Sequence, residues 1–474
     1  MTLHRHDHWI GGADVAPATG GYLPTLNPAT GLAGDEIAAG TAADVERAVA
    51  AAAAAQPAWA ARSAGERSAV LHAVADVVEA SAPELMDAEG DATGKLPSQL
   101  ATEVELSVAY LRYYAGIIRS HHGHTIDHGS GHHTYTRLVP YGVVGIITPW
   151  NLPLNQACRA AAPAIAVGNA VVLKPSELTS VSTLLLARLA TEAGLPAGVL
   201  NVVTGTGPDV GSPLAQHPLV RRLVFTGSVA TGRHLATLAA DRLIPVTLEL
   251  GGKSPLVVFA DADLDRAIAA AVQTVVMNAG QVCSATSRLL VEESAHDDVV
   301  KGVVSALERL APGVDYGPMI TQAQHAKVLE HFDAARADGL EPAIGGQAVA
   351  DGVPAGSLYL QPTVYALVPT TARLARDEVF GPVLVTMTFT DEEDAVRRAN
   401  DTEYGLVGSV WSGDLARGIR VAERIAAGQV AVNGGVLSIE TPFGGFKDSG
   451  YGREKGAEAL HDYCQVQTVS VGLA

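Results

Sequence analysis

One cysteine in the chain is followed and preceded by residues that suit covalent chemistry. Cys283 lies in the segment NAGQVCSATSR (278–288), just beyond a predicted helix and a glycine. Backbone amides around a loop of this kind can favour the thiolate, which is the nucleophilic form of cysteine. Buried cysteines are more often inert, so this pattern alone makes Cys283 a candidate nucleophile and nothing more.

Two polar residues in apolar or rigid surroundings could serve such a nucleophile. Glu249, in VTLELGGKSP (246–255), follows an apolar strand, where burial would raise its pKa toward that of a general base. Asn151, in ITPWNLPL (147–154), lies between two prolines. A fixed amide donor there could stabilise an oxyanion, an interaction whose loss costs roughly 10²–10³ in rate. The alternatives are a solvated or Lys253-paired glutamate and an ordinary turn asparagine.

Several short segments have features of a dinucleotide site. LKPSE (173–177) places Lys174 and Glu177 where they could hold ribose hydroxyls or phosphate. GTGPDVG (205–211) and FTGS (225–228) are glycine-containing turns after predicted strands, where backbone amides can bind a pyrophosphate. DEVFGPV (377–383) offers a carboxylate and an aromatic ring. Each has a plain structural alternative, such as a helix cap, and none is decisive alone.

These segments must be positioned by strands that alternate with helices. Helices are predicted over 42–61 and over 66–119, the second interrupted near 90–97. Short apolar runs at 135–147, 171–177, 200–207 and 222–228 read as strands, and the same rhythm restarts after Glu249 with a helix over about 263–279. The pattern predicts an α/β protein with parallel sheets covered on both faces.

Two further segments have strand character but no obvious partner in either sheet. They are residues 119–138, which include HHGHTIDHGSGHH (121–133), and the C-terminal CQVQTVSV. Edge strands of this kind often pair across subunits, which predicts a homodimer or homotetramer. The irregular histidine spacing favours a solvated loop or subunit edge over metal binding, so no metal site is expected.

Composition excludes several classes of protein. A chain of 474 residues predicts two or three domains, and 48% hydrophobic with 17% charged residues is typical of a folded protein. The formal charge of −18 disfavours nucleic acid. No apolar run is long enough to span a membrane, and the N-terminus lacks a signal-peptide core, so we expect a cytoplasmic protein. Three separated cysteines form neither a disulfide framework nor a zinc site.

Taken in order, seven segments resemble the aldehyde dehydrogenase superfamily: ITPWN, LKPSE, FTGS, LELGGKSP, GQVC, EVFGPV and PFGGFKDSGYGRE (442–454). The resemblance extends from NPATG (27–31) to QVQTV near the C-terminus. It implies a Rossmann-like cofactor domain (1–118 and 139–248), an α/β catalytic domain (249–447) and a small β oligomerisation element (119–138 and 448–474).

The resemblance also implies a mechanism and a cofactor. Cys283 would attack an aldehyde, Asn151 and the Cys283 backbone N–H would stabilise the oxyanion, and Glu249 would activate water to hydrolyse the resulting thioester. NAD is favoured over NADP, which stays possible, because the charge of Glu177 would repel a 2′-phosphate. The cofactor would contact Thr148, Trp150, Lys174, Ser176, Glu177, Gly207, Gly211, Phe225, Gly227, Ser228, Glu378 and Phe380.

Two other activities remain open at this point. In a CoA-acylating relative, coenzyme A rather than water would release the thioester, but such relatives usually lack the glutamate found at 249. A catalytically inactive binding protein of the same fold would be expected to lose the nucleophile or the base, and Cys283 and Glu249 are both present.

The aldehyde itself is predicted from two residues on one helix. Arg159 lies eight residues beyond Asn151, and Asn155 one turn before it on the same face. GQVCSATSR resembles betaine aldehyde dehydrogenases, yet an arginine at 159 would repel a quaternary ammonium. Arginine there looks like the enzymes for succinic semialdehyde and benzaldehyde, which predicts a polar semialdehyde or aromatic aldehyde. The alternative is that Arg159 pairs with an acidic side chain of the protein.

Overall fold

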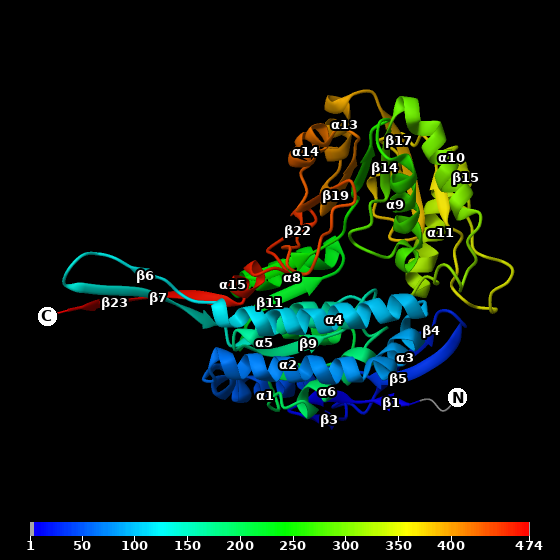
Figure 1. The fold of residues 1–474 in the computed structure, drawn as a ribbon. Coiled ribbons are helices and arrows are strands. Elements are labelled where there is room, and N and C mark those ends of the chain that lie inside the picture. Colours follow the sequence, from blue (N-terminus) through cyan, green and yellow to red (C-terminus); the bar gives the residue numbers. More distant parts are fainter. Residues whose placement is uncertain (1–3, 474) are drawn as a thin grey trace.

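Two largely parallel β-sheets form the framework of the protein (Figure 1). The computed structural model describes residues 4–473. The first sheet has eight strands in the order β22-β12-β11-β8-β9-β10-β2-β3. Their bounds are Gly450–Tyr451, Val246–Glu249, Val220–Thr226, Val143–Ile147, Ala170–Lys174, Leu200–Val202, His8–Ile10 and Ala13–Val15. The five strands from β12 to β10 are parallel, and antiparallel strands close both edges.

Helices cover both faces of this first sheet because successive strand residues point to opposite sides. Val144 and Ile146 of β8 pack into a core with α2, α4, α5 and α6 (Ala64–Ala80, Pro97–Ile117, Pro153–Ala166, Val181–Glu192). Val143 and Ile147 pack on the other face with α1, α7 and α8 (Ala42–Ala60, Ser212–Gln216, Val229–Asp241). This is the predicted α/β arrangement, and the fold class is confirmed.

The second sheet has the same construction. Its order is β15-β16-β17-β14-β13-β19-β20, parallel except at the β15 edge. The strands are Pro342–Ile344, Thr363–Tyr365, Val383–Phe389, Arg288–Glu292, Pro255–Val258, Val407–Trp411 and Gln429–Val432. Helices α9 and α10 (Leu264–Val276, His296–Leu307) cover one face. The other face carries α11, α12, α13 and α14 (Gln322–Ala337, Arg373–Arg376, Glu392–Asn400, Leu415–Arg424).

The helical region predicted over 66–119 consists of three helices, α2, α3 (Ala82–Thr93) and α4. The interruption predicted near 90–97 is present: Gly94 ends α3 in the left-handed conformation, and Pro97 is the first residue of α4. This break brings α3 and α4 together beside the first turn of α5, where Glu89 and Glu103 accept from its N–H groups.

The two segments without an obvious partner in either large sheet pair with each other. β23 (Cys464–Gly472) runs antiparallel to β7 (His132–Pro140), and β6 (Thr125–Ile126) completes a three-stranded sheet that projects from the body (Figure 1). As expected, neither segment has a partner in the two large sheets, but they pair within the chain across more than 300 residues of sequence. Pairing across subunits stays a prediction. Of the predicted oligomerisation segment 448–474, strand β22 instead joins the first sheet.

Smaller elements complete the described chain. Strands β1, β5 and β4 (Arg5–His6, Leu32–Ala38, Tyr22–Asn27) form one sheet, and β18 with β21 (Tyr404–Gly405, Phe446–Lys447) another. Helix α15 (Glu458–Asp462) leads into β23. No helix within residues 4–473 combines the length and apolarity needed to cross a bilayer. The division into domains at the predicted boundaries stays a prediction.

Candidate active site

One pocket brings together the three residues predicted to do chemistry. Cys283, Glu249 and Asn151 all line it, together with Trp150, Glu378 and other residues predicted to bind a cofactor. Glu249 ends β12, where it pairs in register with Thr226 at the end of β11. Asn151 follows β8, the next strand in the sheet. The pocket therefore lies at the carboxyl ends of parallel strands, the edge at which open α/β sheets bind ligands.

The loop that carries Cys283 is held rigidly. Asn278 and Ala279 adopt left-handed backbone angles, with φ of 50° and 51°, which turn the chain out of α9. Gln281 then fixes the turn: its Nε2 donates to the carbonyls of Asn278 (2.8 Å) and Pro318 (3.2 Å), and its Oε1 accepts from the N–H of Ile320 (2.9 Å). Every one of these bonds is buried, so Cys283 is presented from a fixed position.

The thiol of Cys283 does not match the expectation of a favoured thiolate. Burial raises its pKa to about 11, while the nearby positive charge of Arg159 acts in the opposite direction. The sequence showed the loop but not its depth, and desolvation outweighs any stabilisation by nearby amides. At neutral pH the thiol is protonated, so its reaction as a nucleophile requires a group that takes the proton.

Asn151 is tied to the same loop through both its side chain and its main chain. Its Nδ2 donates to the carbonyl of Gln281 at 2.9 Å, and its main-chain carbonyl accepts from Nδ2 of Asn278 at 3.0 Å. An amide nitrogen has two N–H donors, so one remains for the pocket. The side chain is thus oriented by the protein before any ligand binds.

Glu249 is a buried carboxyl group without partners. Its side chain is 1% exposed, and neither carboxyl oxygen has a hydrogen-bond partner among residues 4–473. Burial, and next the negative charge of Glu454, raise the pKa of Glu249 well above its ordinary value, although Arg159 opposes them. The predicted rise in pKa is confirmed. A carboxyl group of this kind can exchange protons near neutral pH.

Arg159 is engaged by the protein itself. Its guanidinium forms a buried ion pair with Glu454 and lies 4.8 Å from the ring centre of Phe443. The residues that line the pocket around Cys283 do not include Arg159. The alternative weighed from the sequence, a pairing with an acidic side chain, is the arrangement found. Glu454 itself was missed, although it ends the segment PFGGFKDSGYGRE, because nothing local indicated its partner 295 residues earlier.

Two aromatic rings and a carboxylate also line the pocket. Trp150 and Phe380 meet edge to face with centroids 5.4 Å apart. Glu378 accepts from the N–H of Gly252 at 3.0 Å through Oε1. Gln324, at the start of α11, donates to the carbonyls of Val379 and Phe380 and supports the turn in which Phe380 has a φ of 53°. Gln324 also lines the pocket and was missed from the sequence.

The remaining predicted cofactor residues are distributed along the same edge of the first sheet. Lys174 ends β9 and its Nζ donates to Glu177 at 3.2 Å. Gly227 and Ser228 line the pocket, whereas Phe225 is buried in the core beneath them, and its contact with the cofactor stays a prediction. Thr148 follows β8, Ser176 and Glu177 follow β9, and Gly207 and Gly211 bound the turn after β10.

A second cavity, of about 350 Å³, lies next to the segments that carry Asn151 and Cys283. Leu152 and Val282, the immediate neighbours of those two residues in the chain, line it. Asn155, predicted to contact substrate, is also part of its wall. The other lining residues are a mixture of polar and apolar side chains, among them Gln99, Thr102 and Leu106.

Comparison with known proteins gives one consistent result. The model of the aldehyde dehydrogenase family matches residues 15–469. A putative aldehyde dehydrogenase from Burkholderia cenocepacia is 43% identical, with a TM-score of 0.96 over 98% of this chain and 99% of that one. An NAD-dependent aldehyde dehydrogenase from Sinorhizobium meliloti is 39% identical (TM-score 0.96, covering 99% and 95%). Betaine aldehyde dehydrogenase from Staphylococcus aureus, solved with NAD+, is 33% identical (0.96, 98% and 94%).

Proposed function

The chain belongs to the aldehyde dehydrogenase family, and from this membership we propose that it oxidises a polar or aromatic aldehyde to the carboxylic acid through a covalent intermediate on Cys283. It is an oxidoreductase that acts on the aldehyde group. The observation that carries the proposed mechanism is the meeting of Cys283, Asn151 and Glu249 around one pocket, with a nucleophile, a donor and a base in one place.

In the proposed first step, the sulfur of Cys283 attacks the aldehyde carbon and a thiohemiacetal forms. The thiol loses its proton in this step, and Glu249 is the carboxyl group on the same pocket that can accept it. The carbonyl oxygen becomes negatively charged, and Nδ2 of Asn151 with the backbone N–H of Cys283 would donate to it. Asn151 needs no reorganisation for this role because Gln281 and Asn278 already hold it.

The pocket also suits the expected cofactor. Trp150 and Phe380 offer ring surfaces, Glu378 offers a carboxylate for a ribose, and the buried Lys174 with Glu177 offers charge and acceptors farther along the sheet edge. NAD, when bound, would accept the hydride that leaves the thiohemiacetal carbon. NAD is proposed over NADP because Glu177 would face a 2′-phosphate with a negative charge, and relatives are NAD-dependent or solved with NAD+.

Release of the acid would depend on Glu249. The thioester on Cys283 needs water as its second nucleophile. Once Glu249 has released the proton of the thiol to solvent, its unpartnered, buried carboxylate can remove the water proton as the water attacks. This requirement favours hydrolysis over transfer to coenzyme A. Because the pKa of Glu249 is raised, its carboxylate is a stronger base than that of an ordinary glutamate.

The substrate class is proposed from the second cavity rather than from Arg159. The guanidinium of Arg159 is paired with Glu454, and Arg159 lines neither cavity, so it is not placed to bind a substrate carboxylate. Asn155, Gln99 and Thr102 give the cavity hydrogen-bonding groups, and Leu106, Leu152 and Val282 give it apolar surface. A mixed wall of this kind fits an aromatic or short polar aldehyde better than a long alkanal.

The test follows NADH formation with purified protein and a panel of succinic semialdehyde, benzaldehyde, salicylaldehyde, betaine aldehyde and hexanal. Cys283→Ala should abolish the signal, whereas Cys464→Ala, a matched change at a cysteine outside the pocket, should leave it unchanged. Highest kcat/KM for an aromatic or polar aldehyde supports the substrate class, and highest kcat/KM for hexanal contradicts it.

Two further measurements separate the alternatives. Reduction of NADP but not of NAD would contradict the cofactor assignment. Formation of acyl-CoA in the presence of coenzyme A, with no free acid in its absence, would replace hydrolysis by acyl transfer. We also propose that the projecting sheet of β6, β7 and β23 joins copies of the chain into a homodimer or homotetramer, which analytical ultracentrifugation would test.

A further inference from the structure

Helix α5 begins without a cap of its own. Leu152 is its N-cap residue and has no side-chain oxygen, and Pro153 at the first position has no N–H. The N–H groups at the start of a helix have no partner within the helix, so they need acceptors from elsewhere. In α5 these are the N–H groups of Leu154 and Asn155, and both residues are buried.

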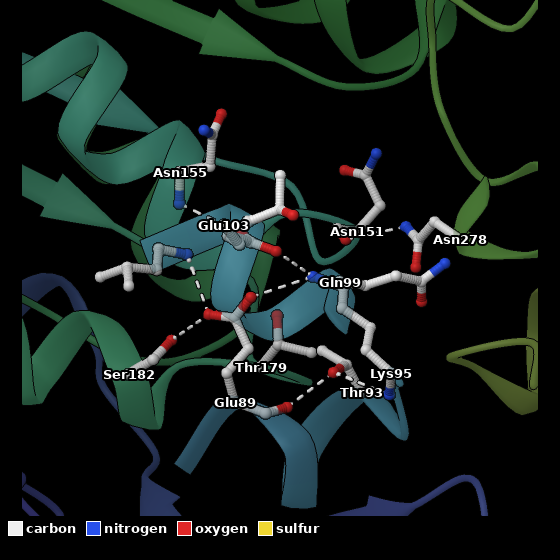
Figure 2. Close-up of polar contacts among 12 residues, drawn as sticks. Glu89, Thr93, Lys95, Gln99, Glu103, Asn151, Asn155, Thr179, Ser182 and Asn278 are labelled. Carbon is white, nitrogen blue, oxygen red and sulfur yellow. Dashed lines mark hydrogen bonds and ion pairs between the residues drawn. The ribbon is translucent and has the colours of Figure 1, made fainter. Parts of the chain in front are cut away.

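Two carboxylates from other helices supply the missing acceptors (Figure 2). Oε2 of Glu89, on α3, accepts from the N–H of Leu154 at 3.2 Å. Oε1 of Glu103, on α4, accepts from the N–H of Asn155 at 3.2 Å. Negative charge at a helix N-terminus is also favoured by the helix dipole. The first turn of α5 is therefore capped by tertiary contacts.

Lys95 holds the two carboxylates together. Its Nζ donates to Oε1 of Glu89 at 2.9 Å and to Oε2 of Glu103, and the three side chains are only 2–3% exposed. Ser182, on α6, adds a bond of 2.9 Å from Oγ to Oε2 of Glu89. Four helices, α3 to α6, are thus joined at one buried cluster. We call Glu89, Lys95 and Glu103 the capping triad.

The capped turn directly follows the proposed oxyanion donor. Only Leu152 separates Asn151 from the first residue of α5. On its other side, Asn151 is bonded to Gln281 and Asn278 of the segment that carries Cys283. Asn151 therefore lies between two anchors, the capping triad through α5 and the cysteine loop through its amide. Release of the first anchor would let α5 and the preceding residues shift relative to the second.

We propose that Glu89, Lys95 and Glu103 are positioning residues for the reaction: by capping α5 they fix Asn151 where its amide can stabilise the oxyanion on a substrate bound to Cys283. This inference rests on the proposed function of Asn151. In this role the triad acts on Asn151 through α5, and not through the sides of Lys95 and Glu103 that border the second cavity. A shift of about 1 Å in a catalytic group can cost on the order of 10²-fold in rate.

Two substitutions of Glu103 test the capping role directly, because one keeps the acceptor and the other removes it. Burial, and next the charge of Glu89, raise the pKa of Glu103 well above its ordinary value, so the neutral Glu103→Gln is a close substitute that keeps an acceptor. Glu103→Leu removes the acceptor at similar size. Glu105→Leu is the matched control, because Glu105 is two residues along the same helix and exposed.

The first readout is independent of activity. Hydrogen–deuterium exchange of the peptide that covers residues 152–158 should be about tenfold faster in Glu103→Leu, because the N–H of Asn155 loses its acceptor. Exchange in Glu103→Gln and Glu105→Leu should equal that of the unchanged protein. Equal protection in all four proteins would overturn the assignment of a cap.

The second readout is a double-mutant cycle on kcat with Asn151→Ala. Glu103→Leu alone should lower kcat about 10²-fold, with the Kd for NAD unchanged within about twofold and with rescue in Glu103→Gln. In the Asn151→Ala background the same change should cost little more, because the group to be positioned is already gone. A full, additive loss in that background would show a general structural role and overturn the proposal.

Two arrangements keep the outcome clear. If Glu103→Leu does not fold, Glu89→Ala, which removes the acceptor of the Leu154 N–H, replaces it, with the same cycle and exchange measurement on residues 152–158. If the unchanged protein reduces no NAD with any aldehyde, the proposed function fails, while the exchange experiment still tests the cap by itself. Loss of protection without any change in kcat would confirm the cap but overturn its role in positioning Asn151.

Discussion

Two groups of buried charged residues lie along helix α5, and they differ in how many of their carboxylate oxygens are hydrogen-bonded. At its first turn, Glu89 and Glu103 each bind Lys95 and a backbone N–H, and no oxygen of either carboxylate is without a partner within the described chain. Farther along, Arg159 pairs with Glu454. Beside that pair, Glu249 has neither oxygen bonded among residues 4–473, although it is equally buried.

The comparison shows that burial alone does not separate a structural carboxylate from a chemical one. Most buried polar groups are hydrogen-bonded, and each exception carries a cost in stability. A satisfied carboxylate such as Glu89 fixes the position of what it binds. An unsatisfied one such as Glu249 retains free acceptor sites and a raised pKa, which are the properties that a general base needs. The two groups should therefore respond in opposite ways to loss of charge.

The largest effect is expected for Glu249→Gln. If Glu249 activates water, steady-state turnover should fall by about 10²–10⁴, the usual contribution of a general base. The first turnover should slow as well, because Glu249 is also the proposed acceptor of the thiol proton. Rapid mixing with NAD and aldehyde should therefore show a slow rise of NADH without a burst. Resistance to urea should stay equal or rise, because the variant removes a buried carboxyl group without partners.

A full burst of NADH followed by slow turnover would mean that another group takes the thiol proton and that Glu249 acts only in hydrolysis. The control is Glu458→Gln, a change of the same type at an exposed position, which should change neither phase. Lower resistance of Glu249→Gln to urea would contradict the contrast between the two groups of charges, since it would mean that Glu249 has stabilising contacts.

Lys95→Met should give the opposite pattern, with a large loss of stability. It would leave Glu89 and Glu103 buried together without a cation, and breaking a buried ion pair in this way costs about 3–5 kcal/mol. Urea denaturation followed by circular dichroism measures the change. The matched control is Arg112→Met, because Arg112 pairs with Asp76 and Glu79 at the surface.

Exposed pairs contribute about 0–1 kcal/mol, so Arg112→Met should shift the midpoint little. Equal midpoints for Lys95→Met and the unchanged protein would mean that the two carboxylates bind a proton in place of Lys95. That result would remove the distinction between a fully bonded triad and the partly bonded group around Glu249.

The sequence was informative where function depends on a local pattern. Cys283, Glu249 and Asn151 each follow a predicted strand or helix, and the ends of parallel strands meet at one edge of a sheet, so their convergence could be predicted. The alternation of strands and helices likewise predicted both sheets. In contrast, the depth of burial that sets the pKa of Cys283 depends on residues from many segments, and the expectation of a favoured thiolate was wrong.

The charge pairings could not be predicted for the same reason. Helical spacing placed Asn155 and Arg159 on one face. Their partners lie in distant segments: Arg159 pairs with Glu454, and the N–H of Asn155 donates to Glu103. One signal for the triad was available: Glu103 lies among the apolar residues of a predicted helix, where a charged residue needs a partner. Which residues are the partners of Glu103 could be known only from the fold.

A smaller effect is expected from Glu454→Gln on the pH profile. Glu249 must be ionised to act as a base, so kcat should fall as the pH decreases through its raised pKa. Glu454 is the negative charge that raises this pKa most, while Arg159 and Arg453 lower it. Its removal should lower the pKa of Glu249 and move the acid limb of kcat to lower pH. An unchanged limb in a pH–rate profile would show that another group controls it.

The smallest effect is expected from Ser182→Ala, which removes one bond from the capping triad. Oε2 of Glu89 loses the donor Oγ of Ser182 but still accepts from the N–H of Leu154. The cost should be about 1 kcal/mol in urea denaturation, well below that of Lys95→Met, and kcat should change less than about threefold. Thr237→Ala, which removes an exposed hydroxyl of α8, is the control. A loss as large as that of Lys95→Met would mean that the triad has no redundancy, and that α6 positions α5 as strongly as α3 and α4 do.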